Sequence, residues 1–577
     1  MYRAELERAS LHELRRKSST PSLGSPQTSL QEHPLCYVGD LSNGEKREFS
    51  VDEGSVLLIR HKSKFYALGS KCAHCGERLS SGLLIRGKIR CSNFGTAYNI
   101  RTGYLEDFPG LDNIQTHTVQ VRNDTVFLMT TREKILAERA LPVMTKCRNF
   151  VNDPVVIIGT GISALTCAET LRQEGFRDRI VMITREDTLP YDRTKLSKTT
   201  EVEPKSLLLR PGEFFENYDI EVMLNTRVSG LTDGEVQPGC LQVKSLNTEE
   251  KVVCLEDGAS VQYSNLVLAM GSVPAKLNVK GADLEGVKYL RTLDDALDLY
   301  ESMKRKHIAV LGSNLLGLEL ASSIGKQSRS VSIFGKGAAP LTMLPTQVGQ
   351  VVREFAQAET LFLRQNSLVK AVEGFDKVGH MVLKDGLCAV AHIVVPAIGV
   401  RPCSSLLLGS SVSTNSHGFV VVDSQMRTSA RHVFAVGDLT SFPLTAFNGN
   451  MVNCDHWYSA QFQGRKAAFA IVSQKEMSVP LVPFFWTVFL DRTLTFAGDL
   501  SCVTDERILR GSLKDNDFVC YCIKNDEVVA VVNAGTRNAA IQFLEMTQHK
   551  IKIKKQDVVK NISDNWITYP STRTLLE

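Results

Sequence analysis

The stretch VVIIGTGISA at residues 155–164 constrains the fold more than any other part of the sequence. Its four leading aliphatic residues predict a short buried strand, and Gly159, Gly161 and Ala164 then follow at the spacing G-x-G-x-x-G/A. In this pattern the first glycine permits a tight turn, the second lets the backbone approach a pyrophosphate, and the third small residue lets helix and strand pack closely. The stretch therefore predicts an α/β domain that binds a dinucleotide at a helix N-terminus.

Size and composition limit the class of protein. A chain of 577 residues is too long for one hydrophobic core, so we expect several domains. The net charge is only +4 and the charges are interleaved, which argues against nucleic-acid binding. The most apolar run, near residues 479–490, is short and contains two prolines, so we expect no transmembrane segment. Fourteen cysteines without a secretory signal predict reduced thiols and a cytoplasmic location, with a mitochondrial location as the alternative.

Changes of pattern along the chain predict its domain organisation. Residues 1–34 are polar and rich in Ser, Thr and Pro, which is typical of a disordered tail. Short strands broken by turns predict a small all-β domain over residues 35–130, and a charged linker follows over 131–152. The other predicted domains are a dinucleotide-binding domain (153–300 and 426–475), a second nucleotide-binding domain (301–425) and a C-terminal α+β domain (476–577).

Two short clusters in the β domain carry candidate metal ligands. Cys72 and His74 form the first cluster, and Cys91 begins the second, which ends at Phe94. The pattern C-x-H…C-x-x-H binds a [2Fe–2S] cluster through two thiolates and two imidazoles. Here Phe94 stands where the second histidine belongs, and a phenyl ring has no lone pair for a metal.

The spacing before Phe94, the following Gly95 and the stretch GYLEDFPG at 103–110 resemble Rieske domains. The resemblance implies the Rieske fold, and we expect a vestigial cluster site because the number of ligands is a strict requirement. The alternative is an intact [2Fe–2S] cluster completed by Cys75 or by water. A zinc site made by the three cysteines with the histidine is compatible by ligand type, but the setting fits the Rieske pattern better.

Further motifs follow one another in a fixed order. They are LPYDRTKLSK at 189–198, LVLAMGSVP at 266–274, HIAVLGSNLLGLELA at 307–321, AIGVRP at 397–402 and VFAVGD at 433–438. Together with GTGISA, this order resembles flavoprotein reductases that have two dinucleotide-binding domains, and specifically the Rieske-bearing members of the apoptosis-inducing-factor-like branch. The resemblance covers nearly the whole chain after residue 35. It implies a multi-domain fold with an N-terminal all-β Rieske-like domain, two doubly wound α/β Rossmann-type domains and a C-terminal α+β domain.

The resemblance also implies an FAD site. Arg193 and Lys198 would contact the flavin or its phosphates, Asp438 would bind the ribityl chain, and Trp486 would face the flavin. Glu186 follows the second predicted strand, where an acidic side chain accepts hydrogen bonds from a ribose. The complete set of predicted FAD-binding residues is Gly159, Gly161, Ala164, Glu186, Arg193, Lys198, Asp438 and Trp486.

The second nucleotide site departs from its pattern. Gly312 and Gly317 are in place, and Glu319 stands where the family carries a glutamate that contacts nicotinamide. Asn314 replaces the middle glycine, so its side chain occupies space that a pyrophosphate must approach. Gly335 stands where the family places a ribose-binding glutamate. We therefore expect NAD(P)H binding to be weakened.

The preferred function is an FAD-dependent oxidoreductase that passes electrons from a nicotinamide nucleotide to an unidentified acceptor, with its NAD(P)H and [2Fe–2S] sites partly degraded. The alternative is a non-enzymatic FAD-binding scaffold or an apoptosis-linked interaction protein, because Phe94, Asn314 and Gly335 replace groups that the family uses. No residue is assigned the role of a catalytic acid, base or nucleophile. A homodimer is compatible with this interpretation.

Overall fold

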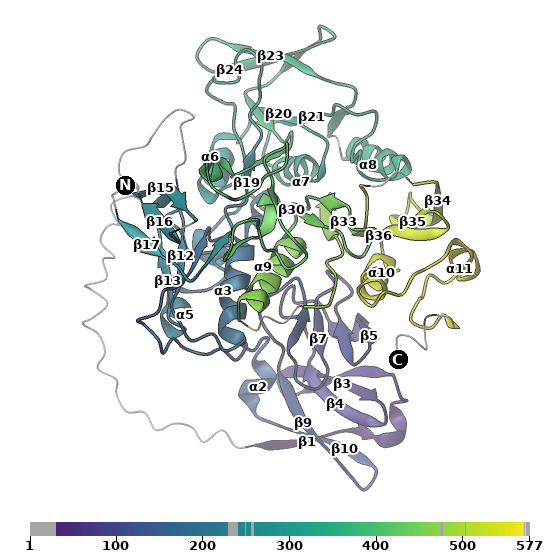
Figure 1. Ribbon diagram of the computed structural model, residues 1–577. Helices are drawn as coiled ribbons and strands as arrows, with labels where there is room; N and C mark the ends of the chain where they lie inside the picture. Colours follow the sequence, from purple (N-terminus) through teal and green to yellow (C-terminus); the bar gives the residue numbers. More distant parts are fainter. Residues whose placement is uncertain are drawn as a thin grey trace. The chain divides into compact units, whose positions relative to one another are not determined.

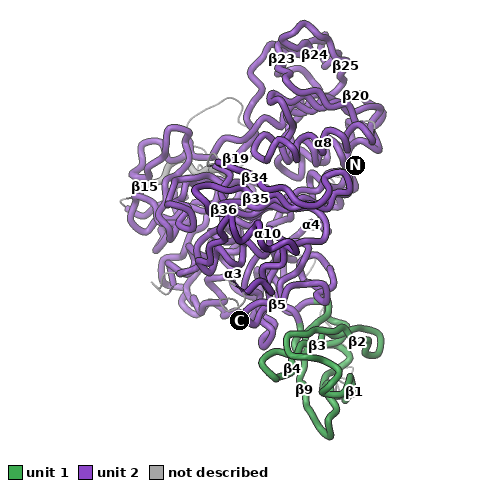
Figure 2. Tube along the Cα trace, turned by 90° about the vertical axis from the view of Figure 1, so that its right-hand side faces the viewer, with its two compact units in different colours: residues 1–70, 115–138 green, residues 71–114, 139–577 purple. Residues whose placement is uncertain are grey.

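The computed structural model describes residues 30–228, 241–248, 250–255, 259–359, 361–472, 477–501, 504–570 and 572 (Figure 1). Residues 1–29 of the predicted tail lie outside the described residues, and strand β1 (Gln31–Tyr37) begins within the last four residues of that tail. The chain forms two compact units (Figure 2). Unit 1 comprises residues 1–70 and 115–138, and unit 2 comprises residues 71–114 and 139–577. The predicted β domain over 35–130 therefore divides between the two units.

Unit 1 is built on an antiparallel six-stranded sheet with the order β1-β10-β9-β4-β3-β2. The other strands are β2 (Lys46–Val51), β3 (Gly54–His61), β4 (Lys64–Gly69), β9 (Thr116–Arg122) and β10 (Thr125–Thr130). Helix α2 (Arg132–Leu136) follows the sheet and contributes Ile135 to a core that contains Val56, Leu58 and Leu128. The short predicted strands thus form one sheet with a core of its own.

The first part of unit 2 is a small antiparallel sheet with the order β5-β6-β7-β8. Its strands are β5 (Leu83–Ile85), β6 (Lys88–Arg90), β7 (Ala97–Asn99) and β8 (Leu105–Asp107). Cys72 and His74 lie in the loop before β5, and Cys91 and Phe94 lie in the loop between β6 and β7. This sheet therefore presents the two predicted ligand clusters on neighbouring loops.

The first predicted nucleotide-binding domain contains a parallel five-stranded sheet with the order β13-β12-β11-β18-β29. Its strands are β11 (Val155–Ile158), β12 (Ile180–Ile183), β13 (Ile220–Met223), β18 (Asn265–Leu268) and β29 (Val433–Ala435). Every residue of β11 and β12 is buried, as expected for parallel strands covered on both faces. Helices α3 (Ile162–Gln173) and α9 (Trp457–Val472) pack side by side (Figure 1). Gly464 permits this approach, because a Cβ there would lie 2.3 Å from the carbonyl oxygen of Ser163.

Shorter elements complete this domain. They are η4 (Arg193–Ser197), α4 (Pro204–Leu207), α5 (Gly212–Asn217), β14 (Thr226–Val228), β15 (Leu241–Asn247), β16 (Val252–Leu255), β17 (Ser260–Gln262), η6 (Gly437–Leu439), β30 (Thr440–Pro443) and β31 (Met451–Val452). Strand β28 (Val420–Val421) falls in the range predicted for the second nucleotide-binding domain but pairs with β30. The paired strands β19 (Ser272–Pro274) and β27 (Val400–Pro402) lie where the chain passes to and from the second nucleotide-binding domain.

The second predicted nucleotide-binding domain contains a parallel sheet with the order β22-β21-β20-β26. Its strands are β20 (His307–Leu311), β21 (Ser330–Phe334), β22 (Phe362–Arg364) and β26 (Ile393–Pro396), with helices α7 (Leu315–Ile324) and α8 (Thr346–Ala358). Helix α6 (Leu293–Ser302) begins before the predicted boundary at residue 301 but shares a hydrophobic core with β20. An antiparallel sheet is added by β23 (Val369–Gly374), β24 (Val378–Leu383) and β25 (Cys388–Val390). The two parallel sheets thus repeat one strand–helix plan.

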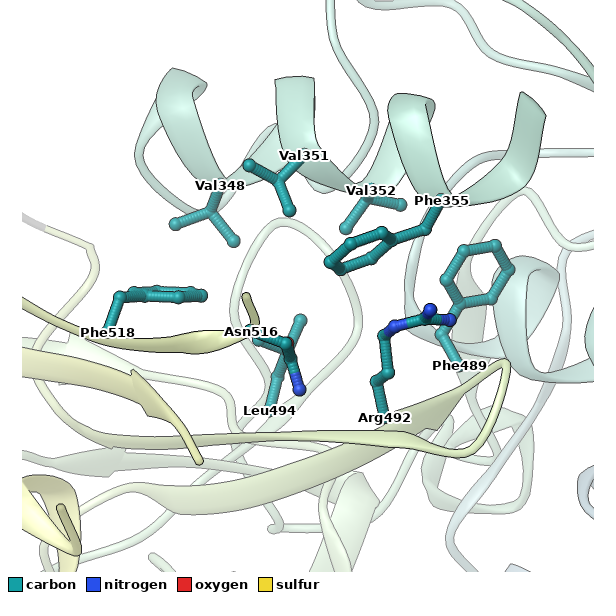
Figure 3. A pocket seen from close by; sticks show the side chains of 9 residues that line it. All are labelled: Val348, Val351, Val352, Phe355, Phe489, Arg492, Leu494, Asn516 and Phe518. Atoms are coloured by element: carbon teal, nitrogen blue, oxygen red, sulfur yellow. The ribbon is translucent and has the colours of Figure 1, made fainter. Parts of the chain in front are cut away.

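The C-terminal region is an antiparallel five-stranded sheet with the order β32-β33-β36-β35-β34, followed by two helices. Its elements are β32 (Phe484–Phe489), β33 (Arg492–Gly498), β34 (Glu506–Ser512), β35 (Asp517–Lys524), β36 (Glu527–Ala534), α10 (Ala539–Gln548) and α11 (Lys555–Lys560). Residues from α8 and this sheet line a small, largely apolar pocket in which Arg492 lies over the ring of Phe355 at 4.2 Å (Figure 3). Within the described ranges, no helix is long and apolar enough to cross a bilayer.

Candidate functional site

The first nucleotide motif forms the strand–turn–helix that the sequence predicts. Gly159 follows β11 with a φ of 115°, and a Cβ at this position would lie 2.3 Å from the carbonyl oxygen of Ala269. Gly161 precedes α3 and provides no side-chain cap for its free N–H groups. A Cβ on Gly161 would meet no atom within 4 Å. Open space beside an uncapped helix N-terminus fits a pyrophosphate, and Ala164 is fully buried behind it in the helix.

Glu186 and Arg193 lie together at the edge of this turn. The carboxylate of Glu186 accepts hydrogen bonds from the Tyr191 hydroxyl, at 2.7 Å, and from the Arg193 guanidinium, which lies over the Tyr191 ring. Burial raises the pKa of Glu186, but the positive charge of Arg193 and these hydrogen bonds outweigh burial and hold the pKa below its usual range. Glu186 therefore remains an ionised acceptor, as the predicted ribose contact requires.

A chain of hydrogen bonds links Arg193 to Asp438. Arg193 donates to the carbonyl oxygen of Arg291 at 3.0 Å, and the guanidinium of Arg291 pairs with the Asp438 carboxylate at 2.9 Å. Ser272 donates a further hydrogen bond to Asp438 at 3.1 Å. The adjacent Gly437 packs against the start of α3, because a Cβ there would lie 2.8 Å from the Ser163 hydroxyl. Segments far apart in the sequence therefore converge on one site, and the residues present fit a bound FAD.

Lys198 and Glu319 form an ion pair that the sequence analysis did not predict. Their Nζ and Oε2 atoms are 2.9 Å apart, and Glu319 is only 7% exposed. Glu319 also accepts hydrogen bonds from Ser197 at 2.7 Å and from Thr487 at 2.9 Å. The predicted flavin contact and the predicted nicotinamide contact are thus neighbours, where both nucleotide-binding domains meet β32.

The side chain of Asn314 occupies the N-terminus of α7. Its Oδ1 accepts a hydrogen bond from the backbone N–H of Gly317 at 3.0 Å, and its Nδ2 donates to the carbonyl oxygen of Ala397 at 2.9 Å. The other two positions still require glycine, because a Cβ on Gly312 or on Gly317 would lie 2.1 Å from a backbone oxygen. The helix therefore caps itself, and the cap takes an N–H group that the motif would otherwise offer to a pyrophosphate.

The expected ribose position at Gly335 is filled by other side chains. A Cβ on Gly335 would lie 2.2 Å from Oε1 of Gln365 and 2.4 Å from the hydroxyl of Ser313. Ser313 donates a hydrogen bond to Gln365 at 3.2 Å. The sequence showed the loss of the acidic residue, but not that these two side chains take its space, because Gln365 comes from a different strand end.

Replacing Asn314 by Gly is expected to tighten NADH binding about tenfold, since one freed N–H–phosphate contact is worth about 1.4 kcal/mol. The same change removes the cap and is expected to lower the stability of this domain by about 1 kcal/mol. Fluorescence titration of the purified protein with NADH measures the affinity. Asn314→Asp is the matched control, because it keeps the cap and adds a charge that repels phosphate. An Asn314→Gly variant with unchanged or weaker NADH affinity would contradict the role assigned to Asn314.

Three cysteines meet at the predicted metal site. The Sγ atoms of Cys72, Cys75 and Cys91 all lie within 4.8 Å of one another, and those of Cys75 and Cys91 are 3.7 Å apart. The Tyr98 hydroxyl lies 3.4 Å from Cys72 Sγ. Hydrogen bonds from the other two cysteines lower the pKa of the Cys72 thiol and outweigh the effect of burial. The structure thus brings Cys75 into the group, whereas His74, a predicted ligand, is not among its members.

Phe94 is packed into an aromatic cluster. Its ring centroid lies 5.6 Å from that of His74 and 4.9 Å from that of Trp486. Trp486 in turn contacts the ring of His456 at 5.1 Å. Burial, followed by the positive charge of Lys198, lowers the pKa of His456 to about 3, so its ring is neutral. A cluster that needs two imidazoles does not fit these residues, because Phe94 offers no donor atom and its ring fills the place of one.

Buried charges fasten the ligand-bearing loops to the C-terminal region. Arg90, at the end of β6, is 1% exposed and pairs with Asp107 at 3.0 Å and with Glu545 of α10. It also donates to the carbonyl oxygen of Gly95 at 2.6 Å. The side-chain partners lie far apart in the sequence, so no local pattern could have predicted this network.

Comparisons with known proteins agree with this architecture. A family model described as pyridine nucleotide-disulphide oxidoreductase matches residues 153–464, and one described as Rieske [2Fe-2S] domain matches residues 31–118. The chain is 35% identical over 554 residues to apoptosis-inducing factor 3 of Homo sapiens. The alignment covers 95% of this chain and 89% of that protein.

Reductases of other systems are similar over the later part of the chain. Rubredoxin-NAD(+) reductase of Pseudomonas putida is 30% identical, over 65% of this chain and 90% of that protein. The solved covalent putidaredoxin reductase–putidaredoxin complex has a TM-score of 0.64 at 26% identity, over 71% of this chain and 98% of that chain. The sheets and these comparisons confirm the predicted fold class.

Proposed function

Because the chain belongs to the pyridine nucleotide-disulphide oxidoreductase family, we propose that it binds FAD at its first nucleotide motif and NAD(P)H weakly at its second. The family confirms the sequence prediction of an FAD-dependent oxidoreductase. Bound FAD would supply the redox chemistry, taking a hydride from the nucleotide and releasing electrons to an acceptor. The protein itself binds the FAD and the nucleotide, orients them and shields them from solvent.

One observation carries this proposal: an open helix N-terminus follows the first motif, and two further predicted FAD contacts, Arg193 and Asp438, are joined through Arg291. The space beside Gly161 is free, and the hydrogen-bonded chain from Arg193 through Arg291 ends at Asp438, whose neighbour Gly437 packs against the start of α3. Asp455 lies close enough to Asp438 for the two carboxylates to interact, because burial and then the negative charge of Asp438 raise the pKa of Asp455 to about 6.

Lys198 and Glu319 are proposed to order the space between the two nucleotides. Glu319 receives hydrogen bonds from Ser197 and Thr487 and pairs with Lys198, so its charge is compensated and its position fixed. Lys198 thereby presents a fixed ammonium group to the region that the resemblance assigns to the flavin.

The proposed electron acceptor is a separate small iron–sulfur protein. Several relatives are by name ferredoxin- or rubredoxin-NAD(+) reductases, and the solved putidaredoxin reductase is joined covalently to putidaredoxin. Within this chain, Phe94 removes a ligand from the site where the family model expects a cluster. Electrons are therefore expected to leave to a partner rather than to a cluster of the same chain.

Anaerobic titration of the purified protein tests this function. We expect FAD to copurify, and its absorbance to be bleached by NADH or NADPH with a half-point at about 1 mM, the upper end of ordinary KM values. Half-bleaching at micromolar nucleotide would contradict the weakened site. If dithionite bleaches the flavin but saturating nucleotide does not, the alternative of a non-enzymatic FAD-binding scaffold is correct. Nucleotide that binds without reducing the flavin would also support the scaffold.

A further inference from the structure

We propose that Cys72, Cys75 and Cys91 bind one zinc ion as three thiolate ligands, in place of an iron–sulfur cluster. The three sulfur atoms form a group within 4.8 Å, and Cys72 and Cys91 are buried. Zinc favours thiolate ligands and needs no second metal or bridging sulfide. The site therefore uses ligands that this chain has, without the histidine that it lacks.

The local backbone supports a metal knuckle at the first loop. Cys72 and Cys75 have the C-x-x-C spacing that is common in zinc sites. Gly76 follows with a φ of 74°, and its N–H donates to the carbonyl oxygen of Cys72 at 2.8 Å. This turn directs both thiols to the same side. A similar turn after Cys91, in which Gly95 N–H donates to the Cys91 carbonyl oxygen at 3.1 Å, supplies the third ligand.

The spacing of the sulfur atoms distinguishes a metal site from a disulfide. Two sulfur ligands on a tetrahedral zinc ion, each at about 2.3 Å from the metal, lie about 3.8 Å apart. The distance between Cys75 Sγ and Cys91 Sγ is 3.7 Å, whereas a disulfide requires about 2.05 Å. The pair is therefore not a disulfide, and its spacing is compatible with two ligands of one ion.

The arrangement also favours one ion over two irons. A Rieske cluster places two thiolates on one iron and two imidazoles on the other, so its donors surround two points. Here three sulfur donors form one group within 4.8 Å, and the rings of Phe94 and Trp486 pack beside His74. With three protein ligands, the fourth position of the tetrahedron falls to water or to another small ligand. The Tyr98 hydroxyl beside Cys72 would stabilise that thiolate from outside the metal shell.

Metal and sulfide analysis of the full chain, purified under argon, tests the zinc site. We expect one zinc ion per chain, no acid-labile sulfide and no stoichiometric iron. Replacing zinc by Co²⁺ is expected to give the visible bands of a tetrahedral thiolate site. Cys75→Ser is expected to lower bound zinc at least about tenfold. Cys147→Ser, which alters another buried cysteine, is expected to leave it unchanged.

A labelling experiment keeps the test decisive if Cys75→Ser fails to fold. In the native chain, zinc should protect the partly exposed Cys75 from alkylation, and a chelator should make it reactive, while the exposed Cys388 reacts in both states. Two irons with two sulfides per chain would overturn the proposal. A Cys75–Cys91 disulfide, or three thiols that stay metal-free after addition of Zn²⁺, would also overturn it. The flavin spectrum, recorded separately, reports on the proposed function and not on this site.

Discussion

Gly161→Leu is expected to abolish FAD binding without unfolding the protein. Gly161 has a φ of −69°, which any residue adopts, and a Cβ there would meet no atom within 4 Å. The substitution therefore introduces no clash in the protein itself. A leucine side chain would fill the space of the pyrophosphate and separate it from the helix N–H groups. Two lost charged hydrogen bonds are worth about 4 kcal/mol, so we expect FAD affinity to fall about a thousandfold.

Flavin absorbance after dialysis, together with thermal unfolding, measures both parts of this prediction. Gly159→Ala is the matched control at the other glycine of the turn. Its Cβ would lie 2.3 Å from the carbonyl oxygen of Ala269 at a φ of 115°, so we expect this variant to lose about 3 kcal/mol of stability. If the Gly161→Leu protein keeps one FAD per chain, the flavin site lies elsewhere.

The contrast between these glycines shows what the sequence can predict. The motif predicted the strand, the turn and the helix, because each depends on residues within one short stretch. The resemblance predicted that Arg193 and Asp438 contact the same cofactor. It did not predict that Arg291 joins them, since that bridge depends on where the polypeptide passes after β19.

The second nucleotide site shows a limit of the same kind. The sequence identified Asn314 and Gly335 as departures, which is a statement about residue types. Whether a substituted side chain blocks a site or turns away depends on its partners. In the structure, the Asn314 side chain caps α7 and donates a hydrogen bond to the carbonyl oxygen of Ala397. The side chain of Gln365 fills the space beside Gly335. Those partners come from other strand ends, so only the folded chain reveals them.

Cys75 is the opposite case, because the structure adds this residue to a site instead of showing how a residue blocks one. From the sequence, Cys75 is expected only as an alternative to water in completing an iron–sulfur cluster, or as one thiol of a less favoured zinc site. In the structure, the turn closed by Gly76 carries Cys75 Sγ to within 3.7 Å of Cys91 Sγ. The C-x-x-C spacing is present in the sequence, but the Rieske pattern assigns Cys72 and His74 as the ligands of this loop and leaves Cys75 out.

Arg90→Met is expected to lower the free energy of unfolding by about 3–5 kcal/mol at neutral pH, because it leaves buried carboxylates without their counter-charge. Asp107 is 5% and Glu545 1% exposed. Lys88→Met is the matched control on the same strand. Its ion pair with Glu106, at 3.2 Å, is partly exposed, so its loss is expected to cost less than about 1 kcal/mol. Urea unfolding of both variants measures the difference, and equal effects would contradict a special role for Arg90.

The pH dependence of this difference identifies the buried charge as its cause. Burial raises the pKa of Glu545, but in the native protein the charge of Arg90 and a hydrogen bond from His549 outweigh burial and hold it well below its usual value of 4.5. The stability from Glu545 is therefore present above about pH 4.5 and is lost as the pH falls towards the lowered pKa. In Arg90→Met, burial is opposed less, so the pKa of Glu545 rises and its ionised form destabilises the fold as the pH rises. The destabilisation caused by Arg90→Met should thus be largest near neutral pH and shrink below about pH 4.5. A difference that does not change with pH would mean that Arg90 acts through packing alone.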